Sequence, residues 1–231
     1  MDIEQAAVLE RFLERLASGE PLAYLIGKRE FYGLDFIVTP DVLVPRPETE
    51  LMVEFALVWL RNHPERLKAA DVGTGSGCIA VALAKNKNDI KLIAVDRSYK
   101  ALLVAQQNAR SHQITQQINF VQADLLTPLA GPFDLLCANL PYIPSRDVID
   151  STVGQHEPRT ALDGGTDGLE FIRRFINQLP SRLTPGGLAL LEIEYRQGAA
   201  TTTHCRTAFP NAKISILRDL AGLDRLLAIE V

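Results

Sequence analysis

The feature that most constrains the fold of this chain is a glycine-rich turn between a short apolar strand and a helix. It reads Asp71-Val-Gly-Thr-Gly-Ser-Gly77. Glycines let the backbone turn sharply and let a ligand approach without a Cβ in the way, and the helix that follows offers free N–H groups. The spacing is G-x-G-x-G, which differs from the G-x-G-x-x-G of a dinucleotide site. The turn predicts a βα unit that ends either in a ligand site or in a plain tight turn.

Short apolar strands alternate with helical patterns from residue 48 onward. The expected strands end at Val72 or cover residues 91–95, 118–122, 133–138, 188–192, 213–217 and 225–231, and the expected helices cover residues 48–62, 77–85, 98–111, 169–179 and 197–209. Repeated βα units with nearly continuous apolar strands indicate an α/β fold whose parallel sheet is covered on both faces. The length of 231 residues fits one large α/β domain with at most a small appendage.

The first 47 residues follow a different pattern. Residues 2–17 predict a helix with a broad apolar stripe. One helix cannot bury such a stripe alone, so we expect it to pack on the main domain or to be the remnant of a helical domain. Residues 29–39 predict a short hairpin around Gly33, and the prolines between residues 40 and 47 predict a stiff, extended connector.

Acidic residues end the strands that follow the glycine-rich turn. A carboxylate at Asp96 can accept hydrogen bonds from both hydroxyls of a ribose, and one at Asp124 can reach an adenine amino group. Either residue alone could be a solvated loop residue or a helix cap. With Asp71 they place three carboxylates at the carboxyl ends of successive strands, where ligands of open α/β sheets bind. A negative group beside the glycine turn favours a cationic, phosphate-free cofactor such as S-adenosylmethionine.

The next strand leads into Asn139-Leu-Pro-Tyr142, which resembles the N-P-P-Y motif of methyltransferases that alkylate planar amide or amino nitrogens. Such a nitrogen is a poor nucleophile because its lone pair is delocalised. Hydrogen bonds from its N–H groups to the Asn139 oxygen and to a backbone carbonyl would aim the nitrogen and offset its growing positive charge. Tyr142 can pack against the flat group and fix its plane.

Taken together, these residues resemble the peptide chain release factor glutamine methyltransferase family (PrmC, or HemK) of class I S-adenosylmethionine-dependent methyltransferases. The similarity runs from about residue 19 to the C-terminus. It also covers the segments GEPLAYLIG (19–27), FYGLDFIV (31–38), LVPRPETE (43–50), EPRTAL (157–162) and LTPGG (183–187).

This resemblance implies a Rossmann-like, seven-stranded, mostly parallel sheet with one antiparallel strand. It divides the chain into a helix at residues 1–18 that is left from a substrate-recognition domain, a hairpin linker at 19–47 and a methyltransferase domain at 48–231. It also implies a cytoplasmic enzyme that methylates the glutamine amide in the Gly-Gly-Gln motif of release factors and leaves S-adenosyl-L-homocysteine.

The resemblance further implies the residues of the site. Those that hold the cofactor are Gly73, Thr74, Gly75, Ser76, Gly77, Asp96, Asp124, Leu125 and Asn139. Those that hold the glutamine are Asn139, Leu140, Pro141 and Tyr142, of which Asn139 and Tyr142 are the catalytic residues. Residues 45–50 are expected to wall the same pocket.

One departure from the family pattern keeps other functions open. Leu140 replaces the first proline of N-P-P-Y, and N-L-P-Y also occurs in ribosomal RNA adenine dimethyltransferases. An adenine-amino methyltransferase acting on RNA or DNA is therefore an alternative, although a net charge of −4 weighs against a nucleic acid as main partner. A non-catalytic S-adenosylmethionine-binding scaffold is a third reading, but a scaffold is expected to have lost Asn139 or Tyr142. An NAD-dependent oxidoreductase would need the dinucleotide spacing.

The remaining residue types suggest a reduced, metal-free cytosolic protein. Cys78, Cys137 and Cys205 fit neither a disulfide framework nor a zinc pattern and are expected to be buried thiols. The four histidines show no metal-ligand spacing. The N-terminus has no long apolar run, so neither a signal peptide nor a membrane span is expected.

Overall fold

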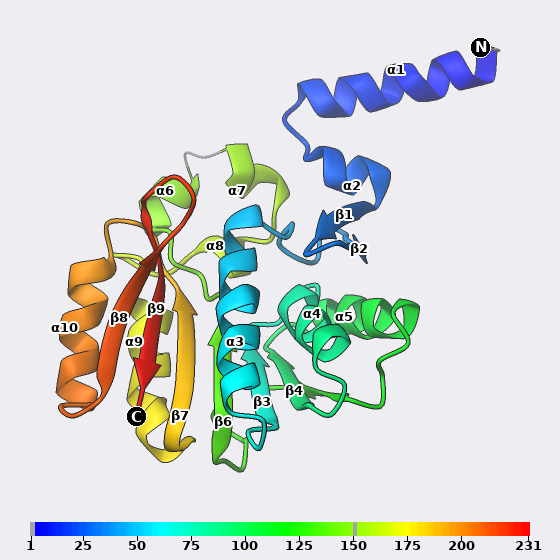
Figure 1. Ribbon diagram of the computed structural model, residues 1–231. Coiled ribbons are helices and arrows are strands. Elements are labelled where there is room, and N and C mark those ends of the chain that lie inside the picture. Colours follow the sequence, from blue (N-terminus) through cyan, green and yellow to red (C-terminus); the bar gives the residue numbers. More distant parts are fainter. Residues whose placement is uncertain (1–2, 150–151) are drawn as a thin grey trace.

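Seven strands in the order β5-β4-β3-β6-β7-β9-β8 form the main sheet of the structure (Figure 1). The computed structural model describes residues 3–149 and 152–231. The strands are β3 (Lys68–Val72), β4 (Lys91–Asp96), β5 (Ile118–Gln122), β6 (Phe133–Ala138), β7 (Leu183–Glu192), β8 (Lys213–Arg218) and β9 (Asp224–Glu230). β9 runs antiparallel to both of its neighbours, and the other pairs are parallel. The predicted sheet, with its one antiparallel strand, is confirmed.

Helices cover both faces of this sheet. They are α3 (Glu50–Asn62), α4 (Cys78–Asn86) and α5 (Tyr99–Ser111) on one face, and α9 (Glu170–Gln178) and α10 (Gly198–Ala208) on the other. Because side chains alternate along a strand, Leu135 and Cys137 of β6 join the core under α3 and α4, whereas Leu136 and Ala138 join the core under α9. Both cores reach full burial, which explains why the strands read as continuous apolar runs.

Several short helices were not predicted because they are too brief to show a periodic pattern. They are α2 (Leu22–Ile26), η1 (Pro47–Thr49), α6 (Ser145–Ile149), α7 (Thr152–His156), α8 (Arg159–Leu162) and η2 (Leu179–Ser181). The predicted helix at 48–62 is therefore a 3₁₀ turn followed by α3. The helix predicted from residue 98 is confirmed as α5, and its Ser98 Oγ accepts the N–H of Ala101 at 3.2 Å.

The hairpin and its connector pack on α5. β1 (Lys28–Phe31) pairs with β2 (Leu34–Ile37) in antiparallel register, as expected. The Asn108 side chain, fully buried on α5, accepts the N–H of Ile37 at 2.7 Å and donates to the carbonyl of Ile37 at 3.0 Å. These bonds hold the linker against the same end of the sheet at which the glycine turn lies.

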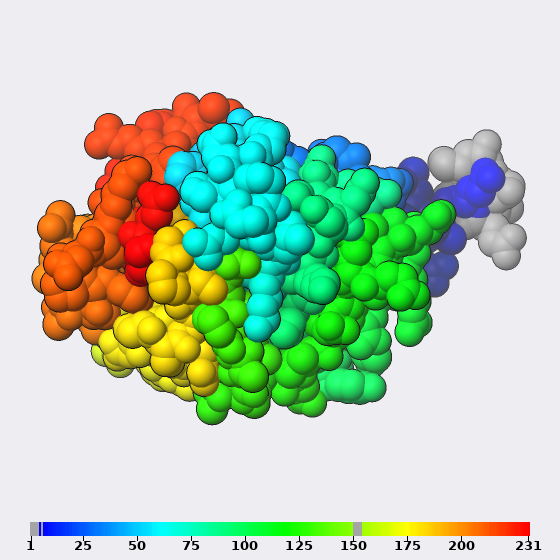
Figure 2. Space-filling model, turned by 60° about the horizontal axis from the view of Figure 1, so that its bottom comes forward, coloured from blue at the N-terminus to red at the C-terminus, as the bar shows by residue number. Residues whose placement is uncertain are grey.

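The first helix, α1 (Ile3–Ala17), does not pack on the main domain, so the first of its two expected partners is wrong. That α1 is the remnant of a helical domain stays a prediction. Phe12 is 42% exposed and Leu13 is 56% exposed. The chain leaves α1 through Gly19, whose φ of +91° turns the backbone, and Figure 2 shows α1 in dark blue extending beyond the α/β body. Within the described residues, no helix is long and apolar enough to cross a membrane.

Candidate active site

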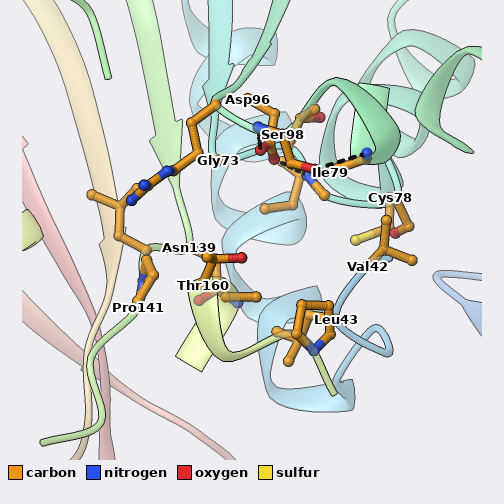
Figure 3. Close-up of a pocket in the computed structure, with 18 of the residues that line it drawn as sticks. Val42, Leu43, Gly73, Cys78, Ile79, Asp96, Ser98, Asn139, Pro141 and Thr160 are labelled. Atoms are coloured by element: carbon orange, nitrogen blue, oxygen red, sulfur yellow. Dashed lines mark hydrogen bonds between the residues drawn. The ribbon is translucent and has the colours of Figure 1, made fainter. Parts of the chain in front are cut away.

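A cleft opens at the carboxyl edge of the sheet. Its walls are the glycine turn, the ends of β4 and β6, the connector and α8. In Figure 3, Asp96 and Ser98 lie on one side of this cleft, across from Asn139 and Thr160. Of the residues predicted to form the site, those that line the cleft are Gly73, Thr74, Gly75, Ser76, Asp96, Asp124, Leu125, Asn139, Leu140 and Pro141. Gly77 and Tyr142 are not among the residues that line it.

Gly77 supports the turn from below. It has a φ of +81°, and a Cβ there would lie 3.0 Å from the Cβ of Ala105 on α5. Gly75 has a φ of +54°, and a Cβ there would meet only the carbonyl oxygen of Gly73, at 3.9 Å. The turn therefore uses one glycine to pack α4 closely on α5 and another to keep the cleft open to a ligand.

Asp71 does not face the cleft, which corrects the expectation that its charge lies beside the cofactor. Its side chain is fully buried, and Oδ2 accepts the Thr74 hydroxyl at 2.6 Å and the Ala80 N–H at 3.2 Å. These bonds tie the glycine turn to the first turn of α4. Burial raises the pKa of Asp71 to about 7 because water no longer solvates the charged carboxylate.

Asp96 is the carboxylate that shapes the cleft. Oδ2 accepts the N–H of Gly75 at 2.9 Å, and Oδ1 accepts the N–H of Ser98 at 2.8 Å. Burial raises the pKa of Asp96 above its ordinary value, and the two backbone N–H groups oppose that rise. The carboxylate thus joins the glycine turn to the start of α5 while facing the cleft.

The next strand contributes Asp124 and Leu125. The exposed Asp124 pairs with Arg174 of α9 at 2.5 Å, so a ligand would compete with or join this ion pair. Leu125 is buried and has a φ of +52°, which is uncommon for a residue with a Cβ. A backbone held in this way fixes the direction of the chain at the cleft wall.

The opposite wall holds Asn139 in a network that the sequence did not reveal. Asn139 Nδ2 donates to Thr49 Oγ1 at 3.1 Å, and Thr49 donates in turn to Glu192 Oε2 at 2.6 Å. The Tyr142 hydroxyl donates to Glu192 Oε1 at 3.3 Å. Burial raises the pKa of both Glu192 and Tyr142. Glu192 ends β7, so the strand-end rule that selected Asp96 would also have selected Glu192.

The connector is held at the cleft by an ion pair whose carboxylate is buried. Glu157 accepts the N–H of Val44 at 3.0 Å and pairs with Arg46 at 2.5 Å. The Glu157 side chain is 1% exposed and that of Arg46 is 34% exposed. This pair fastens residues 42–46 to the segment that leads into α8, and both segments wall the cleft.

The residues present suit S-adenosylmethionine, a cofactor that has a sulfonium charge and no phosphate. The open space at Gly75 admits a ligand close to the backbone, and Asp96 supplies acceptor oxygens within reach of it. Among the residues that the structure describes, no cluster of histidine, cysteine, aspartate and glutamate is placed to hold a metal. All three cysteines are buried and free, as expected.

Comparison with known proteins agrees with this arrangement. Residues 51–156 match the family model "Methyltransferase small domain". A solved structure of the ribosomal protein L11 methylase from Lactobacillus delbrueckii subsp. bulgaricus superimposes with a TM-score of 0.61 at 25% identity, over 83% of this chain and 82% of that one. The N-terminal domain of human METTL16 in complex with SAH gives a TM-score of 0.60 at 19% identity, over 86% and 76% of the two chains, and shares the fold.

Curated relatives are more similar in sequence. The release factor glutamine methyltransferase of Nitratidesulfovibrio vulgaris is 41% identical over 227 residues, which cover 95% of this chain and 76% of that protein. The enzyme of the same name from Moorella thermoacetica is 44% identical over 216 residues, covering 92% and 76% of the two chains. With this identity over nearly its whole length, the chain belongs to the release factor glutamine methyltransferase family.

Proposed function

We propose that this protein methylates the side-chain amide nitrogen of the glutamine in the Gly-Gly-Gln motif of peptide chain release factors, with S-adenosylmethionine as donor. The observation that carries the proposal is the fixed orientation of Asn139. Its Nδ2 is engaged by Thr49, so Oδ1 is the group left to accept a substrate N–H at the cleft wall. An acceptor beside the glycine turn is what methyl transfer to an amide nitrogen requires.

The cofactor supplies an activated methyl group on its sulfonium. Asp96 and the glycine turn would hold it by the ribose and the backbone, and Asp124 and Leu125 would hold its adenine. The chain's own task is then to position the glutamine nitrogen, since positioning and exclusion of water account for most of such catalysis. Asn139 Oδ1 and the backbone carbonyl of Leu140 would accept its two N–H groups and offset the charge that grows on nitrogen.

Tyr142 would fix the plane of the glutamine amide from the side. It is partly buried, and its backbone carbonyl accepts a hydrogen bond from Gln197 Nε2 at 3.0 Å. Leu140 packs against the turn, because a Cβ on Gly73 would lie 3.2 Å from Leu140 Cδ2. The leucine that departs from the family motif thus packs on the glycine turn at the cleft wall, and its backbone carbonyl is the second acceptor in this proposal.

The proposal is tested by incubating a release factor with the protein and isotope-labelled S-adenosylmethionine, followed by peptide mass spectrometry. One added methyl group on the Gly-Gly-Gln glutamine is expected, and Asn139→Ala is the matched control. A parallel reaction with ribosomal RNA tests the alternative that Leu140 raises, methylation of an adenine amino group. Label in the RNA with none in the release factor would overturn the proposal.

We also propose that α1 helps to bind the release factor, that residues 19–47 serve as a linker to the methyltransferase domain at 48–231, and that the reaction takes place in the cytoplasm. The exposed apolar side chains of α1 support the first part. His156 also bonds to the carbonyl of Ser18 at 3.0 Å, which ties the end of α1 to a segment near the cleft. Deletion of residues 1–17 should raise KM for the release factor more than it lowers kcat. An unchanged KM would exclude α1 from recognition.

A further inference from the structure

Glu192 lies behind the cleft wall, where it cannot touch a substrate. It is the last residue of β7, it is 2% exposed, and it is absent from the cleft lining. Its two oxygens accept the hydroxyls of Thr49 and Tyr142. Thr49 and Tyr142 come from segments before α3 and after β6, so one carboxylate joins two walls of the site.

We propose that Glu192 is a positioning residue that sets the orientation of the Asn139 amide through the hydroxyl of Thr49. The proposal rests on the proposed function, because it assigns to Asn139 the task of accepting the substrate N–H. It extends that function to two residues that do not contact the substrate amide themselves.

The direction of the hydrogen bonds carries the argument. Both oxygens of Glu192 accept hydroxyls, one from Thr49 and one from Tyr142, and a threonine hydroxyl has a single hydrogen to donate. Once Thr49 donates to Glu192 at 2.6 Å, its oxygen can only accept from Asn139, and the group that donates there is Nδ2 at 3.1 Å. The Asn139 oxygen must then lie on the other side of the amide. Without Glu192, Thr49 could donate to Asn139 instead, and the amide could turn its NH₂ group towards the substrate N–H.

The local structure of Thr49 supports this role. Thr49 is the last residue of the η1 turn and has helical φ and ψ of −69° and −19°, whereas a capping side chain that accepts a backbone N–H comes from a non-helical residue. Here it makes no such bond, and its hydroxyl is used between Glu192 and Asn139 instead.

The burial of Glu192 points the same way. A buried carboxylate is costly unless it is paired and hydrogen-bonded. The charged groups that act on it are Arg225 of β9, which favours the ionised form, and Glu48 of the η1 turn, which opposes it. Both oxygens of Glu192 accept hydrogen bonds. Oε1 accepts from Tyr142 of the proposed glutamine site, and Oε2 is linked to Asn139 of that site through Thr49. The carboxylate thus serves to orient that site.

Matched variants of Thr49 separate orientation from packing. Thr49→Val keeps the shape of the side chain and loses the hydroxyl, whereas Thr49→Ser keeps the hydroxyl and loses a methyl group. With the full chain and a release factor as substrate, we expect Thr49→Val to lower kcat by about 10-fold or more, less than the ~10²–10³ of removing a transition-state hydrogen bond outright. Thr49→Ser should stay within a few-fold of wild type, and both should bind S-adenosylmethionine as wild type does. Loss of activity in Thr49→Ser equal to that in Thr49→Val would overturn the proposal, and so would an unchanged kcat in Thr49→Val.

Glu192→Gln provides the second arm. Glutamine keeps the shape but can donate from its amide, so the direction of the chain of hydrogen bonds is no longer fixed. Because both changes break one chain, Thr49→Val should cost much less in the Glu192→Gln background than in the wild type. Multiplicative losses would show that Glu192 and Thr49 act independently and would refute the relay.

A spectroscopic readout keeps this test separate from the test of the proposed function. The side-chain NH₂ signals of Asn139 in a ¹⁵N–¹H spectrum, assigned by their loss in Asn139→Asp, should shift in Thr49→Val and return in Thr49→Ser. If wild-type protein transfers no methyl group to the release factor while these signals behave as expected, the proposed function fails and the relay stands. If the signals do not respond to Thr49→Val, the relay fails whatever the activity.

Discussion

The buried carboxylate of Asp71 makes the stability of the fold depend on pH in a defined window. Its pKa is about 7 in the folded protein, whereas the ordinary value for an aspartate is 3.8, a difference of roughly three units. At about 1.4 kcal/mol per unit, the linked change in the free energy of unfolding is on the order of 4 kcal/mol. The folded state holds this proton more tightly than the unfolded chain, so the contribution is present in full below pH 3.8 and is lost as pH rises through about 7.

The Asp71→Asn variant isolates this effect because asparagine does not titrate. Its side-chain oxygen can still accept from Thr74 and Ala80, while its NH₂ group replaces Oδ1, which has no partner. The unpaired NH₂ group lowers the free energy of unfolding by an amount that does not change with pH. The free energy of unfolding of the variant minus that of wild type should therefore rise from about pH 4 to pH 7, because the wild type loses stability over this range, and should stay level above pH 7. Urea unfolding at a series of pH values measures this difference.

A second variant provides a control of opposite sign. The N–H groups of Leu223 and Ala221 and the Arg225 side chain lower the pKa of Asp219, with Leu223 the largest cause. Asp219→Asn should therefore differ from wild type in its pH dependence only as the pH falls below about 4, where the native contribution of Asp219 is lost. A difference between Asp71→Asn and wild type that stays constant from pH 4 to 8 would refute the reasoning on Asp71.

Three further substitutions test the glycine turn and the cleft. Gly77→Ala should lower the free energy of unfolding by more than Gly27→Ala does. Both glycines have a positive φ, which costs about 1–2 kcal/mol with a side chain, but only at Gly77 would the new Cβ also press on Ala105. Equal losses of stability in urea unfolding would contradict this. Asp96→Ala should weaken S-adenosylmethionine binding by about 1–3 kcal/mol in calorimetry, because ribose hydroxyls lose their acceptor; unchanged affinity would remove Asp96 from the site. Asn139→Ala should reduce kcat by ~10²–10³ with a much smaller loss of cofactor affinity, and a kcat close to wild type would show that another group accepts the substrate N–H.

The order of strands and long helices could be predicted from the sequence because each has a local signature. β5 and β6 were predicted at their observed bounds. For β6, five of whose six residues are buried, the signature is an almost continuous apolar run. α5 was predicted from a helical pattern with a serine cap at its start. The short helices around the cleft have no such signature, because four or five residues do not complete a second turn. The exposure of α1 was not predicted. An apolar stripe on a helix indicates that burial would be favourable, but it does not show whether a partner surface lies within reach.

For the candidate site, the sequence by itself determined which side chains come to the carboxyl edge of the sheet, because that follows from their place after each strand. Only the tertiary structure decided which of them face the cleft. Asp71 and Asp96 end neighbouring strands, yet one is sealed under α4 and the other faces the cavity. Thr49 and Glu192 are 143 positions apart in sequence and meet only because α3 and β7 pack together. A hydrogen bond depends on the distance and direction of two groups after folding, and no local pattern records either one.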